Sequence, residues 1–183
     1  MRAVTQAEGD APTWRLVLLR HAKAEPGKGV LPDDRRPLAL NGRKQAGRVG
    51  MALTAAGLLP QVALVSSAVR TRQTWDLASA HLDGSSGTAL EVRDELYEAS
   101  VRDVLGLLRG VEASTRTVLV IGHEPTMAAT AAYLAAEGSE PAALAQVRVG
   151  VPTATYSVLE SAEHPWADWD RGSARLVHVG RPS

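Results

Sequence analysis

The sequence contains no cysteine among its 183 residues. This absence excludes disulfide bonds, thiolate catalysis and cysteine-ligated metal ions from its chemistry. It also removes any positive sign of an oxidising compartment. We therefore expect the cytoplasm as the default location of this protein.

The chain also lacks a net charge, because 20 Lys and Arg residues are balanced by 20 Asp and Glu residues. No global field draws it to nucleic acid or to a membrane surface, and we expect neither as a partner. No stretch of the sequence approaches the roughly 18 consecutive apolar residues of a membrane span. Residues 1–13 lack the apolar core of a signal peptide, and we expect them to form a short flexible tail.

The chain does contain enough apolar residues for one hydrophobic core. Hydrophobic residues make up 45% of it and charged residues 22%, which is ordinary for a globular protein. A length of 183 residues fits one domain and leaves little room for a second. We expect residues 14–183 to fold as a single domain.

Short apolar runs alternate with helical patterns along the chain. The runs predict strands at residues 15–19, 62–65, 88–92, 117–122, 154–159 and 174–179. The run at 117–122 has no polar face, which predicts a central strand. The alternation favours the α/β class, with a three-layer α/β/α sandwich around a mostly parallel central sheet.

Start signals for three helices lie between these strands. We expect Asn41 to cap a helix that ends at Gly57. Ser100 and Asp103 have the spacing of a capping box, and Pro125 stands where a first helical residue would be. The helix after Pro125 should therefore begin directly behind the strand at 117–122.

Side chains that suit phosphate chemistry follow three of the predicted strands. They are Arg20 and His21 after the first strand, Arg70 after the second and His123 after the fourth. The carboxyl ends of parallel strands meet along one edge of an α/β sheet, so we expect these four side chains to converge. Convergence would create a site for an anion.

The expected site contains the groups that phosphoryl transfer needs. Two guanidinium groups match phosphate oxygens from two sides, and the amino end of the helix after His123 also favours an anion. Neutral imidazole is a good nucleophile toward phosphorus, and nearby arginines disfavour its protonated form. We expect His21 to attack phosphorus, while Arg20, Arg70 and a protonated His123 stabilise the developing charge.

The order of these motifs resembles the histidine phosphatase superfamily, also called the phosphoglycerate mutase-like family, from about residue 15 to residue 179. "LLRHAKA" is similar to its Arg-His-Gly motif, which implies His21 as nucleophile and Arg20 as phosphate ligand. "SSAVRTRQT" resembles the segment with the second phosphate arginine, at Arg70, and "VIGHEP" the segment with the second histidine, at His123. Ala22 replaces the motif glycine, so its backbone must avoid a glycine-only conformation.

Within the superfamily, the small size and the segment "RPLALNG" resemble the SixA-like phosphohistidine phosphatases. The resemblance implies Arg36 as a further phosphate ligand, no cofactor or metal ion, and a phosphohistidine-bearing protein as substrate. A small phosphorylated ester is the alternative substrate. Alignment on the family's Leu-x-Glu pattern favours Glu98 over Glu95 as proton donor. An imidazole leaving group, with a pKa of about 6.5, needs such an acid less than an alcohol does.

Two other readings of the same residues remain open. One is a metal-dependent hydrolase that uses His21, His123 and a carboxylate, although the sequence has no His-x-x-x-His pair and no aspartate cluster. The other is a non-catalytic module that binds phosphorylated protein. Trp166 and Trp169 lie in the loop between the last two strands, and either a cover over the sheet edge or a binding surface is compatible with them.

Overall fold

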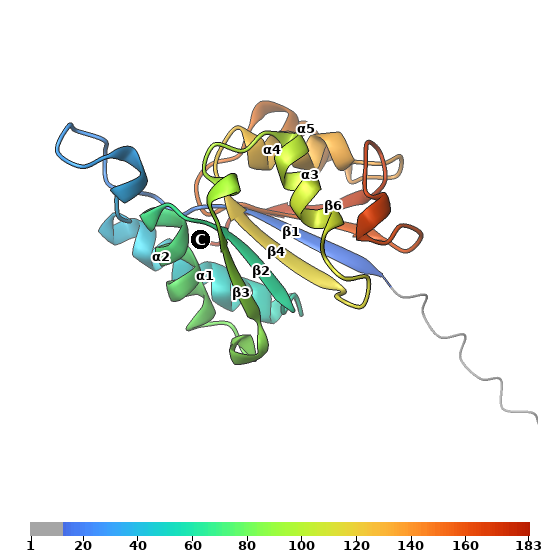
Figure 1. Cartoon of the computed structure of the whole chain (residues 1–183), viewed down its shortest axis with the longest axis horizontal. Coiled ribbons are helices and arrows are strands. Elements are labelled where there is room, and N and C mark those ends of the chain that lie inside the picture. Colours follow the sequence, from blue (N-terminus) through green and yellow to red (C-terminus); the bar gives the residue numbers. More distant parts are fainter. Residues whose placement is uncertain (1–12) are drawn as a thin grey trace, which may run out of the picture.

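The computed structural model describes residues 13–183, which contain one sheet with helices on both faces (Figure 1). Six strands form this sheet in the order β3-β2-β4-β1-β5-β6. The strands are β1 (Trp14–Arg20), β2 (Val62–Ser66), β3 (Ala89–Arg93), β4 (Thr117–Gly122), β5 (Tyr156–Ser161) and β6 (Arg175–Gly180). The helices are α1 (Leu40–Ala55), α2 (Val69–Ser79), α3 (Val101–Arg109), α4 (Thr126–Leu134) and α5 (Pro141–Val149). The tail expected at residues 1–13 falls almost wholly on residues 1–12, which lie outside the described residues.

The sheet is mostly parallel, as the alternation of strands and helices predicts. β4 pairs in parallel with both β1 and β2, and β2 pairs in parallel with β3. β4 is therefore an inner strand, as its lack of a polar face predicts. β5 runs antiparallel to β1, and β6 runs antiparallel to β5.

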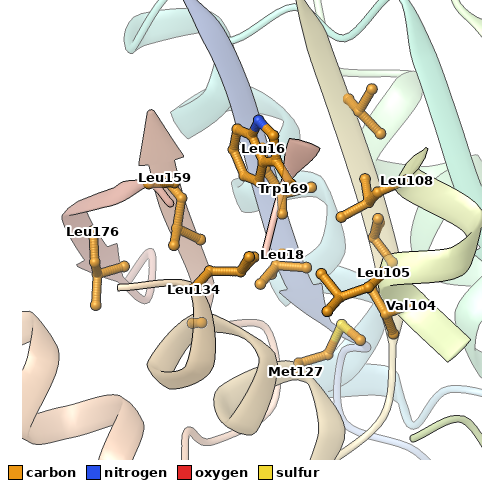
Figure 2. Packing of buried hydrophobic residues seen from close by; sticks show 14 of the residues in the cluster. Leu16, Leu18, Val104, Leu105, Leu108, Met127, Leu134, Leu159, Trp169 and Leu176 are labelled. Atoms are coloured by element: carbon orange, nitrogen blue, oxygen red, sulfur yellow. The ribbon is translucent and has the colours of Figure 1, made fainter. Parts of the chain in front are cut away.

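The inner strands are apolar on both sides because each side of the sheet is covered by helices. In β1, Leu16 and Leu18 belong to a buried cluster with residues of α3 and α4, part of which Figure 2 shows. Val17 and Leu19 point the other way, into a cluster with residues of α1 and α2. These four side chains are at most 1% exposed. The predicted three-layer α/β/α sandwich is confirmed.

The loop between β5 and β6 closes one of these layers with two tryptophans. Trp166 and Trp169 are fully buried, with ring centroids 4.8 Å apart. Their indole N–H groups donate to the carbonyl oxygens of Thr115, at 2.7 Å, and His164, at 2.8 Å. Both rings therefore serve as a cover for the sheet, and a binding surface made of them is ruled out.

Two of the expected helix starts are wrong by one or two residues. The first helix begins at Leu40 with Ala39 as its N-cap, so Asn41 is not the cap. The N–H of Ala39 donates to the carbonyl of Lys23 at 2.9 Å, and this tertiary contact sets the start. Pro125 immediately precedes α4 instead of beginning it. The capping box of Ser100 and Asp103 is confirmed at α3.

Helix α5 was not expected from the sequence. Pro141 stands at its first turn, and the carboxylate of Glu140 accepts hydrogen bonds from the N–H groups of Ala142 and Ala143. None of the helices within residues 13–183 is both long and apolar enough to span a bilayer.

The carboxyl ends of β1, β2 and β4 meet at one edge of the sheet. Arg20 is paired with Gly122, and Val65 with Ile121. The segment that leaves β1 at this edge extends away from the sheet, passes through the short 3₁₀ helix η1 (Asp33–Arg35) and returns to α1 (Figure 1). Residues far apart in the sequence therefore converge at this edge.

Candidate active site

His21 directly follows β1 at this edge of the sheet, and one of its two ring nitrogens forms no hydrogen bond with the described residues. Its Nδ1 lies 2.7 Å from the carbonyl oxygen of Ala22. Because a carbonyl oxygen only accepts, Nδ1 carries the hydrogen, and Nε2 keeps its lone pair. The residue is 8% exposed, so this lone pair lies in a shielded position. This is the tautomer that a nucleophilic Nε2 requires.

The backbone around His21 is fixed from two sides. The N–H of His21 donates to the carbonyl of Gly122 at 3.1 Å. The N–H of Ala22 donates to Thr74 Oγ1 at 3.1 Å, and that hydroxyl donates to the carbonyl of Arg70 at 2.7 Å. Ala22 is fully buried, and its φ is not in the positive range. The expectation that the backbone avoids a glycine-only conformation there is confirmed.

Burial keeps His21 neutral. Desolvation lowers its pKa from the ordinary 6.5 to about 4. The hydrogen bond to Ala22 opposes this shift, and the charges of Arg70 and Arg20 add to it. Burial, more than the arginines named in the sequence argument, is thus the main reason that the imidazole is unprotonated near neutral pH.

His123 faces His21, with ring centroids 5.3 Å apart. Its Nδ1 lies 3.4 Å from Arg70 Nη2, which can only donate, so Nδ1 accepts and Nε2 carries the hydrogen. Nε2 then donates to Ser66 Oγ at 2.8 Å. Ser66, at the end of β2, is a site residue that the sequence argument did not single out.

His123 is neutral in this arrangement, whereas the sequence argument expects it to be protonated when it stabilises a bound phosphoryl group. Its pKa is lowered to about 3, first by burial and then by the proximity of His21 and the charge of Arg70. A phosphate dianion beside the ring would oppose these effects and raise the pKa again. The protonated form is therefore expected only with an anion bound.

Arg70 comes from the first turn of α2 and is 5% exposed. Its Nη1 donates to the backbone carbonyl of Asp33 at 2.7 Å, and its Nη2 donates to Asp33 Oδ2 at 3.1 Å. The Nε–H is buried and has no partner among the described residues. The Nε–H of this guanidinium is thus unpaired, while its Nη2 lies next to His123.

Arg20 ends β1 and is held by the segment after α5. Its Nη1 donates to the carbonyl of Val151 at 2.7 Å, while its Nε is buried without a partner among the described residues. Its charge is near enough to lower the pKa of both His21 and His123. Arg20 and Arg70 therefore each bring an unpaired buried Nε–H to the neighbourhood of the two imidazoles.

Glu124 is a second residue that the sequence argument missed. Its carboxylate accepts from the N–H of Ala128 at 2.9 Å and from the N–H of Val151 at 3.1 Å. Through Val151 it supports the carbonyl that binds Arg20. The N–H groups of Met127 and Ala128 are thus taken, by the carbonyl of His123 and by Glu124. The expected contribution of free amides of α4 to anion binding is wrong for these two groups.

Asp33 and Tyr97 complete the surroundings of Arg70, and neither was singled out from the sequence. Tyr97 OH donates to Asp33 Oδ2 at 2.6 Å, and the Tyr97 ring lies edge-on to His123 with centroids 5.6 Å apart. Arg36 Nε donates to Asp33 Oδ1 at 2.9 Å, and its Nη1 donates to the carbonyl of Glu25 at 2.7 Å. Arg36 is thus paired with Asp33, and its charge reaches His21, whose pKa it lowers.

Glu98 follows the 3₁₀ helix η3 (Asp94–Leu96) and is exposed. No hydrogen bond or ion pair joins its side chain to any described residue, and the same is true of Glu95. The carboxylate favoured as proton donor is therefore not fixed in one orientation by its neighbours. Its role stays a prediction.

No group of three or more His, Asp and Glu side chains within residues 13–183 is arranged to bind a metal ion. The convergent groups are instead two imidazoles and two guanidiniums. Fixed guanidinium donors match phosphate oxygens, and a neutral imidazole with a free Nε2 is a nucleophile. The arrangement can bind a tetrahedral anion and attack it.

We expect Gly42→Ala to disrupt the site from a distance. A Cβ on Gly42, in the first turn of α1, would lie 1.9 Å from the carbonyl oxygen of Lys23, two residues beyond His21. Because that neighbour is backbone, the segment carrying His21 must shift, at a cost of about 3 kcal/mol in the free energy of unfolding. Denaturant unfolding and turnover measure this effect.

Gly106→Ala in α3 is the matched control for that substitution. A Cβ at Gly106 meets nothing within 4 Å, so we expect unchanged or slightly raised stability. Equal stability of the Gly42→Ala and Gly106→Ala proteins would contradict the argument.

Comparisons with known proteins agree with this geometry. A sequence model of the histidine phosphatase superfamily (branch 1) matches residues 16–113. An uncharacterized protein of Mycobacterium tuberculosis is 37% identical over 166 residues, which cover 89% of this chain and all of that protein.

Solved structures give the same result. A SixA protein of Nakamurella multipartitia, a candidate phosphohistidine phosphatase, is 33% identical with a TM-score of 0.77, covering 93% of this chain and 96% of that one. A second SixA candidate, from Agrobacterium tumefaciens, is 28% identical with a TM-score of 0.75, covering 92% of this chain and 98% of that one. The predicted phosphoglycerate mutase-like fold is confirmed.

Proposed function

The chain belongs to the histidine phosphatase superfamily, and we propose that it is a metal-independent phosphatase that forms a phosphohistidine on His21. The observation that carries this proposal is the convergence of two guanidiniums on two facing imidazoles, of which His21 has its Nε2 lone pair unused. Arg20 and Arg70 bind the phosphoryl oxygens, and the Nε–H of each is unpaired among the described residues.

In the first step, Nε2 of His21 attacks phosphorus, and the bond from phosphorus to the leaving group breaks. The leaving group departs with the bonding electron pair and takes up a proton, which solvent supplies to an imidazole and Glu98 to an alkoxide. The Nδ1–H of His21 already donates to the Ala22 carbonyl, which stabilises the positive charge that develops on the ring. Arg20 and Arg70 offset the negative charge on the phosphoryl oxygens.

In the second step, water attacks the phosphorus of phosphohistidine, and the bond from phosphorus to Nε2 breaks. His21 recovers its lone pair, and inorganic phosphate leaves with the hydroxyl from water, while the second proton of the water passes to a phosphate oxygen or to solvent. His123 donates a hydrogen bond through Nε2 to Ser66 and has Nδ1 as an acceptor toward Arg70. Its protonation beside the anion would add a donor at Nδ1.

Phosphohistidine on a protein is the substrate that we propose. The SixA proteins with similar structures are named as candidate phosphohistidine phosphatases. The unfixed position of Glu98 supports the same choice, because an imidazole leaving group needs less help from an acid than an alkoxide does. A small phosphate ester is the second candidate, supported by the presence of Glu98 next to the site residue Tyr97. The cytoplasmic location expected from the composition stays a prediction.

Glu98→Gln separates these two substrate classes. We expect less than about a threefold loss of turnover with a phosphohistidine protein, and about a tenfold or larger loss with p-nitrobenzyl or alkyl phosphate, whose leaving groups need a proton. Glu95→Gln is the matched control and should change neither rate. Equal, large losses with both substrates would contradict the proposed preference for phosphohistidine.

A direct comparison of substrates tests the proposed function. The purified protein is given a phosphohistidine phosphotransfer domain, sugar phosphates and nucleotides, each with and without EDTA. We expect the highest kcat/KM with the phosphohistidine protein and no effect of the chelator. Activity that EDTA removes and zinc or manganese restores would favour a metal-dependent hydrolase. Binding of the phosphoprotein without turnover would favour a non-catalytic module.

A further inference from the structure

The carboxylate of Asp33 is a fixed anion beside the candidate phosphate site, by which we mean the side chains of Arg20, His21, Arg70 and His123. It accepts from Tyr97 OH at 2.6 Å, from Arg36 Nε at 2.9 Å and from Arg70 Nη2 at 3.1 Å. The backbone carbonyl of Asp33 accepts a second bond from Arg70, at 2.7 Å. A residue in an external segment is thus tied to the arginine in the pocket by two contacts.

These contacts divide the donors of Arg70 between Asp33 and the pocket. A guanidinium has five N–H donors in a rigid planar array. Asp33 takes one from Nη1 and one from Nη2, whereas Nε–H remains without a partner among the described residues. A phosphoryl group bound at Nε would therefore share Arg70 with a carboxylate that is already present.

Asp33 remains ionised while its carboxylate is bound to Arg70. The hydrogen bond from Tyr97, and then those from Arg36 and Arg70, hold the pKa of its carboxyl well below the usual range. Its side chain is nevertheless 55% exposed, against 7% for Arg70. The negative charge thus sits at the solvent side of the arginine and opposes any anion that binds on the other side.

The release of inorganic phosphate after each catalytic cycle needs such an opposing charge. Arg70, Arg20 and Arg36 carry positive charges that lie near enough to lower the pKa of His21, and both histidines are neutral. Without a counter-charge, these positive charges would bind inorganic phosphate tightly and slow its release after each cycle. One carboxylate on two of these three arginines lowers the attraction without removing a donor from the unpaired edge of Arg70.

We propose that Asp33 is the counter-ion of the phosphate pocket, a positioning residue that acts through Arg70 and Arg36 to limit the affinity for inorganic phosphate. This role rests on the proposed phosphatase function, because it concerns the release of its product. It predicts that removal of the Asp33 charge strengthens phosphate binding. Structural damage to the site would instead weaken phosphate binding.

The test is the dissociation constant of inorganic phosphate, measured by calorimetry at fixed ionic strength. We expect Asp33→Asn to lower it about tenfold, because the substitution removes one negative charge next to the bound anion. Asp34→Asn is the matched control. It changes the net charge equally one residue away, where the side chain is exposed and forms no hydrogen bond within the described residues, and it should leave the constant unchanged.

Every result of this experiment decides the question. Unchanged or weaker phosphate binding in Asp33→Asn, or an equal gain in Asp34→Asn, overturns the role of Asp33 even if the wild-type protein is an active phosphatase. Tighter binding in a protein that proves inactive on all phosphorylated substrates supports the role of Asp33 and overturns the proposed function. Asp33→Ser serves as a second variant should Asp33→Asn fold poorly, with the same expected tightening.

Discussion

His21→Ala is expected to reduce phosphatase turnover by about 10⁴-fold or more, to the level of the uncatalysed reaction. The substitution removes Nε2, whose lone pair forms the bond to phosphorus in the proposed phosphoenzyme. Arg20, Arg70 and His123 would still bind phosphate. Turnover should therefore be lost while the affinity for inorganic phosphate changes by less than about threefold.

His21→Asn distinguishes the loss of the nucleophile from damage to the fold. The amide of asparagine can donate to the Ala22 carbonyl as Nδ1–H of His21 does, and it fills part of the same buried space. It has no atom in the place of Nε2. We expect it to be as inactive as His21→Ala but closer to wild type in thermal stability.

A trapping experiment measures the intermediate itself. Brief mixing with a ³²P-labelled phosphohistidine protein, followed by alkaline quenching, should leave label on the wild-type chain and none on the His21→Asn chain. Label that persists on the variant would place the nucleophile elsewhere. Full turnover of any substrate by His21→Ala would refute the proposed mechanism.

The main features of the fold can be predicted from the sequence, because the pattern of apolar residues in each strand matches the burial of that strand in the folded protein. The run at 117–122 has apolar side chains for both faces, and β4 is indeed covered on both faces. The carboxyl ends of parallel strands lie at one edge of the sheet. The convergence of Arg20, His21, Arg70 and His123 could therefore be predicted from the sequence alone. Their roles in catalysis stay predictions until the variants are measured.

The features that were missed depend on contacts between distant segments. Asn41 has the right chemistry for a cap, but the bond from Ala39 to Lys23 begins the helix earlier. Asp33 lies in a segment rich in proline and charge, where no periodicity indicates which carboxylate reaches Arg70. Glu124 offered a usable signal, since a carboxylate just before a helix commonly binds its first N–H groups. Glu140 and Pro141 offered the same signal for α5.

Arg70→Ala is expected to lower kcat/KM by about 10³-fold, which corresponds to about 4 kcal/mol of transition-state stabilisation. Arg70 is the most buried of the pocket's charged side chains and contacts His123 directly, so solvent cannot replace it. Removal of Arg70 also removes the positive charge of α2 that is paired with Asp33. The remaining carboxylate would then repel the phosphoryl group.

Arg70→Lys tests whether the charge or the shape of the guanidinium matters. A lysine restores a positive charge but cannot bind Asp33 through two nitrogens while presenting a third to the anion. We expect it to recover no more than about tenfold of the lost kcat/KM. Arg72→Ala, in the same helix but exposed, is the matched control and should stay within twofold of wild type.

Because Asp33 opposes the anion once Arg70 is gone, the Arg70→Ala and Asp33→Asn double variant should bind phosphate better than Arg70→Ala alone. Full activity of Arg70→Ala, or an equal loss in Arg72→Ala, would remove Arg70 from the phosphate site.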